Sequence, residues 1–251
     1  FIPRYAININ KQRDLALERL AEIAEKKLIS VFDFSDNPKR IFTAHEIVGQ
    51  MDGSAATKLT VQFNLFGGTL LNLGNNDLHS QYLKEIDSLE SIGCFGLTEL
   101  GYGNNAAEMQ TTATYDEKEK EFILNTPSSL ARKYWITNGA LHAHFCIVFA
   151  RLIIKDNDEG IHAFLVPIRD KELNVINGVS IWDMGHKIGI NGIDNASIGF
   201  NNVKVPKDSL LGDTSSIDDQ GNFESKINKK RDRFLYVADR LLSGRLCIAS
   251  M

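Results

Sequence analysis

The stretch that decides the fold reads T-A-T-Y-D-E-K-E-K-E-F-I-L and occupies residues 112–124. Both of its ends are rich in β-branched and aromatic residues, and five consecutive charged residues, 116–120, separate them. This pattern predicts two strands joined by a polar turn. Further short runs of the same kind follow, with Gly and Asn between them, at residues 146–154, 161–168, 179–182, 197–200 and 203–205. Together they predict a small antiparallel sandwich or barrel rather than a parallel sheet with crossover helices.

The residues before this β region follow a helical pattern. Leu15, Leu20 and Ile23 recur at steps of three to five among charged residues, which predicts an amphipathic helix. The spacing of Thr43 and Glu46 is that of a capping box and predicts the start of a second helix. Two more helices are predicted downstream, a buried one within the strongly apolar residues 57–73 and another at residues 78–89.

The residues after the β region return to a helical pattern. The polar residues 212–224 predict a mobile loop, and helical spacing of apolar residues resumes near Ser225 and continues to the last residue, Met251. We therefore expect a piece of a longer α+β multi-domain protein. Its expected parts are an N-terminal helical domain (1–92), a middle β domain (93–212), a loop (213–224) and the start of a C-terminal helical bundle (225–251).

Composition excludes several classes of protein. The chain has 251 residues, of which 43% are hydrophobic and 24% charged, and its formal net charge is −4. These values are not those of a disordered or collagen-like chain, and the acidic balance gives no reason to expect nucleic acid as a partner. No run of 18 apolar residues occurs, so we expect no membrane span. The three cysteines form no C-x-x-C pair and favour reduced, buried thiols.

Short motifs with a known chemistry are incomplete. The G-Y-G at residues 101–103 lacks a third glycine and precedes strands, so a dinucleotide fingerprint is not supported. His45 and Glu46 begin H-E-x-x-H, but the second histidine is missing. His142 and His144 would share one face of a strand and could chelate a metal, yet ordinary packing is the favoured interpretation. No metal is expected.

Three other features keep two interpretations each. The basic residues between Lys226 and Arg233 form either a solvated helix start or a contact for a phosphorylated ligand. Arg245 stands in an apolar helical pattern, where its charge must pair or reach water. Trp135 is either a core residue or an aromatic face that stacks on a planar ring.

Two segments about 35 residues apart resemble the flavin-binding signature of the acyl-CoA dehydrogenase and acyl-CoA oxidase superfamily. They are C-F-G-L-T-E-L-G-Y-G-N (residues 94–104) and Y-W-I-T-N-G (residues 134–139). Other segments resemble the peroxisomal acyl-CoA oxidases in particular, namely V-Q-F-N-L-F-G-G (61–68), T-T-A-T-Y-D (111–116), V-P-I-R-D (166–170) and G-H-K-I-G-I-N-G-I-D-N (185–195). The order and spacing hold over most of the chain. The resemblance implies a helical, a β and a second helical domain, with FAD between the last two.

The resemblance also assigns cofactor-binding residues. The matching positions are Phe95, Leu97, Thr98, Gly103, Asn104, Trp135, Thr137 and Arg245. Thr98 would hydrogen-bond the pyrimidine side of the flavin, where a donor stabilises the negative charge that develops on reduction. Trp135 would pack against the ring system, and Thr137 would lie beside flavin N5. Phe95 and Leu97 would line the ring through side chain or backbone.

The remaining matches concern phosphates and the base. The backbone at Gly103 and Asn104 would meet the FAD pyrophosphate, and Arg245 would reach a FAD phosphate across a dimer interface. The family's catalytic glutamate lies beyond Met251, so no catalytic residue is assigned within the chain. Glu99 lies in the flavin segment, but nothing in the sequence qualifies it as that base. We therefore expect that residues 1–251 alone do not turn over substrate.

The implied reaction is α,β-dehydrogenation of an acyl-CoA thioester, with electrons passed to O₂ to give H₂O₂. A homodimer in the peroxisome is the corresponding expectation. Residues 137–139, T-N-G, are dehydrogenase-like, because many oxidases have Gly where Thr137 stands, so a mitochondrial dehydrogenase that uses a carrier flavoprotein is the alternative. A catalytically inactive relative and a flavoenzyme that acts on another substrate class also remain open.

Overall fold

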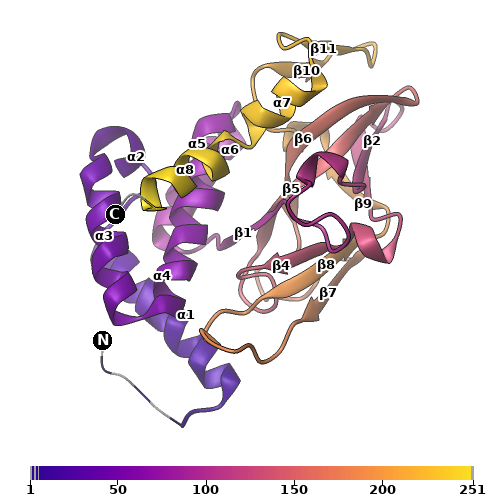
Figure 1. Cartoon of the computed structure of the whole chain (residues 1–251). Helices are drawn as coiled ribbons and strands as arrows, with labels where there is room; N and C mark the ends of the chain where they lie inside the picture. Colours follow the sequence, from indigo (N-terminus) through magenta and orange to yellow (C-terminus); the bar gives the residue numbers. More distant parts are fainter. Residues whose placement is uncertain (1, 3, 5, 250–251) are drawn as a thin grey trace.

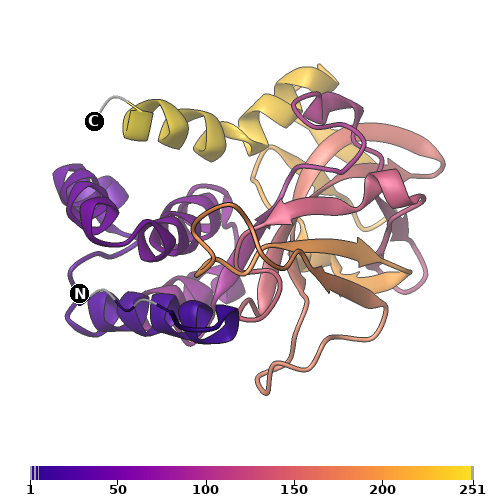
Figure 2. The same cartoon turned by 60° about the horizontal axis from the view of Figure 1, so that its bottom comes forward.

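The computed structural model describes Ile2, Arg4 and residues 6–249, with all side chains in that span except those of Leu78 and residues 245–249. Its helices gather on one side and its strands on the other (Figure 1). The helical side is built from α1 (Ile9–Glu25), α2 (Asp33–Asp36), α3 (Pro38–Met51), α4 (Gly53–Leu59), the π-helix η1 (Thr60–Gly67), α5 (Gly68–Leu73) and α6 (Asp77–Ser88). The C-terminal helices α7 (Lys230–Val237) and α8 (Asp239–Ala249) return from the strands toward this side (Figure 2).

Side chains at the helix starts explain where the helices begin. Asn8 accepts a hydrogen bond from Lys11 N at the start of α1, and Asp52 accepts from Ser54 N and Ala55 N at the start of α4. The second predicted start is wrong, because α3 begins at Pro38 and places the Thr43 pair in mid-helix. Proline suits the first helical position, since its fixed φ is already helical and its missing N–H has no partner there.

The predicted buried helix is confirmed as the continuous segment α4, η1 and α5. Its apolar side chains Phe63, Phe66 and Leu70 are fully buried. The neighbours pack closely, since a Cβ at Gly67 would lie 2.9 Å from Val31 Cγ2. The predicted helix at residues 78–89 is also confirmed, as α6.

The predicted strands are present and form two sheets. The six-stranded sheet runs β1-β5-β2-β3-β9, with β6 paired to β5, and the second sheet runs β4-β8-β7. Their bounds are β1 (Gly93–Gly96), β2 (Thr112–Asp116), β3 (Glu121–Asn125), β4 (Lys133–Ile136), β5 (Phe145–Ile154), β6 (Asn157–Pro167), β7 (Val179–Asp183), β8 (Ala196–Phe200) and β9 (Val203–Pro206). This confirms the fold class, with one difference: β5 pairs in parallel with both β1 and β2.

The polar segment predicted as a loop contains a small hairpin instead. Strands β10 (Ser215–Ile217) and β11 (Phe223–Ser225) pair in antiparallel fashion. Asp218 makes the turn, since its carboxylate accepts hydrogen bonds from Gln220 N and from the backbone and side chain of Asn222. Polar residues that bond their own backbone form such turns, so high polarity here does not mean the absence of strands.

The six-stranded sheet separates two hydrophobic cores. Alternate residues of β5 point to opposite faces: Ile147 and Phe149 join the helical core, whereas Cys146, Val148 and Ala150 join the core between the two sheets. The sheet therefore packs against the helices with one face and against the smaller sheet with the other. Short 3₁₀ turns at Ala106–Glu108, Ser129–Ala131 and Lys207–Ser209 complete the β side.

No helix among the described residues is both long and apolar enough to cross a membrane.

Candidate functional site

Two distant segments lie side by side where β1 ends and β4 begins. Tyr134 N donates to Thr98 O at 2.9 Å, and the Thr98 hydroxyl donates to Tyr134 O at 2.7 Å. An antiparallel bridge between Glu99 and Lys133 continues this pairing. The structure therefore brings together the two segments, 94–104 and 134–139, that carry the sequence signature.

The Thr98 side chain is exposed, but its single proton is already used. Because the hydroxyl donates to Tyr134 O, only its acceptor lone pairs face outward in this arrangement. A ligand that needs a donor at this position requires the hydroxyl to turn away from Tyr134.

The segment 134–139 turns sharply and presents an aromatic ring to the surface. Trp135 and Asn138 have φ values of 64° and 66°, in the left-handed region, and the Trp135 side chain is 55% exposed. This exposure agrees with a stacking surface and not with a core residue. Thr137 lies half-buried in the same turn, and its hydroxyl accepts from Asn195 Nδ2 at 3.4 Å. A planar ligand could rest on the exposed indole.

The side chains of Phe95 and Leu97 point away from this surface. Both are buried in the core between the sheet and the helices, and the Phe95 ring lies 5.0 Å from that of Phe149. Alternation along β1 sends these two side chains to the helical face and leaves Thr98 exposed. Any contact that Phe95 and Leu97 make with a ligand at this surface would come from their backbone.

The turn at Gly103 and Asn104 is open to solvent. Gly103 has a φ of 47°, and no atom of the described residues lies within 4 Å of the position that a Cβ would occupy. Its N–H donates to Glu99 O at 3.2 Å. A glycine with free space outside allows a ligand phosphate to approach the backbone closely.

Glu99 lies just before the turn at Gly103 and Asn104, and both oxygens of its carboxylate already accept hydrogen bonds. Its carboxylate accepts from Gln110 N, from the N–H and hydroxyl of Thr111, and from Lys133 Nζ at 2.9 Å. Glu99 and Lys133 are both fully buried. Burial lowers the pKa of Lys133, while the carboxylate opposes that effect. The ion pair therefore stabilises the fold, and the Glu99 carboxylate is not available as a catalytic base.

A second buried charge cluster lies directly behind the 134–139 turn, and the sequence analysis missed it. Lys58 Nζ donates to the Asp194 carboxylate and to Asn138 Oδ1 at 3.0 Å, and it lies 3.1 Å from His142 Nδ1. The Lys58 and Asp194 side chains are 1% and 0% exposed. Burial opposes ionisation of Asp194, but the charges and hydrogen bonds of Lys58 and His142 together outweigh it and hold the carboxyl pKa well below its usual range.

A signal for this cluster was present in the sequence. Lys58 is the single charged residue between positions 57 and 73, and a lysine in an apolar buried helix needs a carboxylate partner. Asp194 itself lies within one of the quoted motifs, but 136 positions along the chain separate it from Lys58.

Three further predictions concern the histidine pair, Arg245 and the basic cluster. His142 and His144 lie in a turn before β5, not on a strand, and no group of three His, Cys, Asp or Glu side chains among the described residues could hold a metal. Arg245 belongs to α8, but its side chain lies outside the described residues. Within the basic cluster, Arg233 pairs with Glu159 at 3.3 Å.

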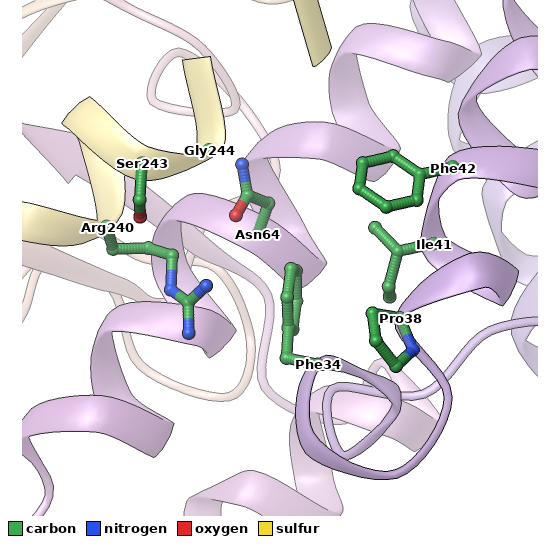
Figure 3. Close-up of a pocket in the computed structure, with 8 residues that line it drawn as sticks. All are labelled: Phe34, Pro38, Ile41, Phe42, Asn64, Arg240, Ser243 and Gly244. Carbon is green, nitrogen blue, oxygen red and sulfur yellow. The ribbon is translucent and has the colours of Figure 1, made fainter. Parts of the chain in front are cut away.

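An apolar cavity of about 170 Å³ lies between α2, α3, η1 and α8 (Figure 3). Its lining consists of Phe34, Pro38, Ile41, Phe42, Asn64, Arg240, Ser243 and Gly244. The Asn64 Oδ1 atom is buried and has no hydrogen-bond partner among the described residues. The Arg240 guanidinium lies 4.5 Å above the Phe34 ring. The cavity is thus mainly apolar, with polar groups toward α8.

Comparison with known proteins relates both halves of the chain to one group of enzymes. A family model described as "Acyl-CoA dehydrogenase, middle domain" matches residues 94–203. A peroxisomal acyl-coenzyme A oxidase 2 of Arabidopsis thaliana is 38% identical over 251 residues, covering 97% of this chain and 36% of that protein. The human peroxisomal acyl-coenzyme A oxidase 3 is 35% identical, covering 99% of this chain and 36% of the human protein.

Solved structures agree with these relatives. The crystal structure of acyl-CoA oxidase 1 from Yarrowia lipolytica superposes with a TM-score of 0.84 at 31% identity, covering 95% of this chain and 34% of that one. Acyl-CoA oxidase 1 of Caenorhabditis elegans, complexed with FAD and ATP, gives a TM-score of 0.75 at 26% identity, covering 95% and 35%. The chain spans about a third of the length of these relatives.

Proposed function

Because this chain belongs to the acyl-CoA oxidase family, we propose that it supplies the flavin-contacting and N-terminal parts of an acyl-CoA oxidase. The whole enzyme would oxidise acyl-CoA thioesters to trans-2-enoyl-CoA and pass the electrons to O₂, giving H₂O₂. The family placement and the fold support this proposal. The observation that carries it is the direct pairing of Thr98 with Tyr134, which unites the two signature segments into one exposed surface.

The exposed groups of this surface fit FAD. Trp135 would stack on the ring system, Thr98 and Thr137 would face its polar edge, and the open turn at Gly103 and Asn104 would admit the pyrophosphate. When bound there, FAD would supply the two-electron acceptor of the reaction. Phe95 and Leu97 would contribute backbone alone, and Arg245 remains a proposed phosphate contact.

The substrate's acyl chain would occupy the apolar cavity between α3 and α8. Its lining by Phe34, Ile41 and Phe42 favours methylene groups, and none of its lining residues carries a carboxylate. We assign no catalytic base within the chain, because Glu99 is held in its buried pair with Lys133. A peroxisomal location is proposed with the function, since relatives are named peroxisomal. A homodimer is proposed as well, from the family resemblance alone.

The decisive experiment follows the flavin colour of the full-length protein. A long-chain acyl-CoA is added without oxygen, the flavin absorbance is recorded, and air is then admitted. We expect bleaching, followed in air by rapid recovery with formation of H₂O₂. Persistent bleaching in air would instead indicate a dehydrogenase, and absence of bleaching would contradict the acyl-CoA substrate.

Thr137 is the residue that sharpens the choice of electron acceptor. If its hydroxyl and methyl group restrict the approach of O₂, Thr137→Gly will raise the rate of recovery in air relative to the rate of anaerobic bleaching. Thr137→Ser is the matched control, because it keeps the hydroxyl and removes only the methyl group. An unchanged recovery rate in Thr137→Gly would show that this position does not govern the reaction with oxygen.

A further inference from the structure

The segment 134–139 that would face the flavin contains two residues in the left-handed backbone region. Trp135 and Asn138 both have φ near +65°, a region that side chains as bulky as Trp rarely adopt and that Asn tolerates better. Such conformations persist only where the surrounding structure holds them. The contacts of Asn138 therefore decide whether the turn keeps its shape.

Asn138 is held by both its side chain and its backbone. Its Nδ2 donates to Gly93 O at 3.2 Å, and its Oδ1 accepts from Lys58 Nζ at 3.0 Å. Its own carbonyl accepts from Ala143 N at 2.9 Å. Lys58 comes from α4, so one of these anchors reaches the turn from the helical side of the molecule.

The Lys58 ammonium group donates to the Asp194 carboxylate and to Asn138 Oδ1, and it lies 3.1 Å from His142 Nδ1. Asp194 in turn accepts from Leu141 N at 2.9 Å and from His142 N at 3.3 Å. The carboxylate thus fixes the chain that follows the turn. A fully paired network of this kind specifies one arrangement of its members.

The neighbour of Asp194 completes the arrangement on the other side. Asn195 Nδ2 donates to the Thr137 hydroxyl at 3.4 Å. Thr137 is therefore fixed from two sides. The next residue, Asn138, is bonded to Lys58, and the Thr137 hydroxyl itself is bonded to Asn195, the residue after Asp194.

We infer that Lys58 and Asp194 are positioning residues for the flavin-facing turn, which fix Asn138 and through it the hydroxyl of Thr137. The inference rests on the proposed function, because it takes the turn as a flavin contact. A pair that served folding alone would have no effect on the flavin beyond its effect on stability. A positioning pair changes the environment of the flavin even in a folded, fully loaded protein.

The first variant removes both charges together. In the full-length protein, Lys58→Met with Asp194→Asn leaves neither charge buried without its partner, so the fold is expected to persist. We expect a shift of the flavin's visible absorption bands and a rise of about tenfold in the FAD dissociation constant. Anaerobic reduction by acyl-CoA is expected to slow by about tenfold or more in FAD-saturated protein.

A second variant and a matched control separate position from stability. Asn138→Gly permits the same left-handed backbone but deletes the side-chain anchor, and it is expected to shift the flavin spectrum in the same direction. Phe122→Leu is the matched control for stability, because the Phe122 ring is fully buried against Tyr115 and Phe164 in the core between the two sheets and its truncation lowers stability. Phe122 makes no hydrogen bond or ion pair with Lys58, Asp194 or Asn138, so we expect an unchanged spectrum and FAD affinity within about twofold.

The outcomes separate this inference from the proposed function. Unchanged flavin spectrum and FAD affinity in both the Lys58 double variant and Asn138→Gly would overturn the positioning role, as would equal effects in the Phe122 control. If the unaltered protein binds FAD but is not bleached by acyl-CoA, the proposed function fails while the spectral comparison still decides the inference. If the unaltered protein binds no FAD, both are overturned.

Discussion

Two buried lysine–carboxylate pairs support the two halves of the candidate flavin surface, and they are built differently. Lys133 and Glu99 lie on neighbouring segments of the β side and stand beneath the Thr98 segment. Lys58 and Asp194 join the helical side to the β side and stand behind the Thr137 turn. All four side chains are almost completely buried.

The difference shows how each half of the surface depends on the rest of the molecule. The Glu99 carboxylate is satisfied mainly by β-side backbone at Gln110 and Thr111, so the Thr98 segment is held from within the β domain. The Thr137 turn needs a lysine from α4. Of the two buried pairs, only Lys58 and Asp194 therefore link their half of the surface to the helical side through an ion pair.

The largest expected effect comes from breaking either pair from one side. Lys133→Met and Lys58→Met each leave a buried carboxylate without its cation, and each is expected to lower the free energy of unfolding by about 3–5 kcal/mol. Chemical denaturation measures this loss. Lys155→Met is the control, because Lys155 pairs with Glu117 at 3.9 Å on the surface, and a change within about 0.5 kcal/mol is expected. A loss below about 1 kcal/mol for both buried variants would mean that water reaches the pairs.

A buried histidine without such a charge partner sharpens the comparison through pH. His162 in β6 lies 3.2 Å from Ser215 Oγ, and burial lowers its pKa from 6.5 to about 4. Between these values the unfolded chain binds the proton more readily, so the stabilisation is complete above pH 6.5 and is lost as the pH falls toward 4. The loss is expected to reach about 3 kcal/mol, at about 1.4 kcal/mol per pKa unit.

Denaturation at a series of pH values, with His162→Gln as the comparison, tests this expectation. The variant is expected to show a smaller loss of stability between pH 6.5 and pH 4. Parallel pH profiles for the protein and the variant would contradict the assignment of the slope to His162.

The smallest expected effect concerns the hydrogen bond that joins the two signature segments. Thr98→Val removes the hydroxyl that donates to Tyr134 O at 2.7 Å, and a loss of about 1 kcal/mol in unfolding free energy is expected. Thr98→Ser keeps the donor and is expected to retain most of that stability. Equal stability in all three proteins would show that the contact between the segments rests on the backbone bond from Tyr134 N.

Sequence reasoning predicted most of the architecture, because the hydrophobic spacing is strongly periodic in both regions. The alternation on both sides of residues 116–120 became the β2–β3 hairpin, and the apolar run at 57–73 became a buried helical segment. Predictions failed where one sequence pattern is compatible with two different local structures. The Thr43–Glu46 spacing is satisfied equally inside a helix, and the polar residues 212–224 fold as a hairpin around Asp218.

The candidate site was predicted less completely than the fold. The segments that the motif resemblance singled out lie side by side, with the side chains of Thr98 and Trp135 exposed and with Gly103 in an open turn. The resemblance could not foresee that Phe95 and Leu97 face the helical core, because a motif records residue identity and not the face of the strand. Whether these residues contact FAD remains a prediction.

The sequence by itself determined the helical–β–helical order and the identity of the signature segments, since local periodicity and residue pattern carry that information. The tertiary structure alone decided which buried charges meet. Lys58 and Asp194 are separated by 136 positions, and no local preference links them. The packing of α4 against the β domain brings the two side chains together. Because a buried ammonium group without acceptors is costly, this packing is stable only where a partner such as Asp194 is present.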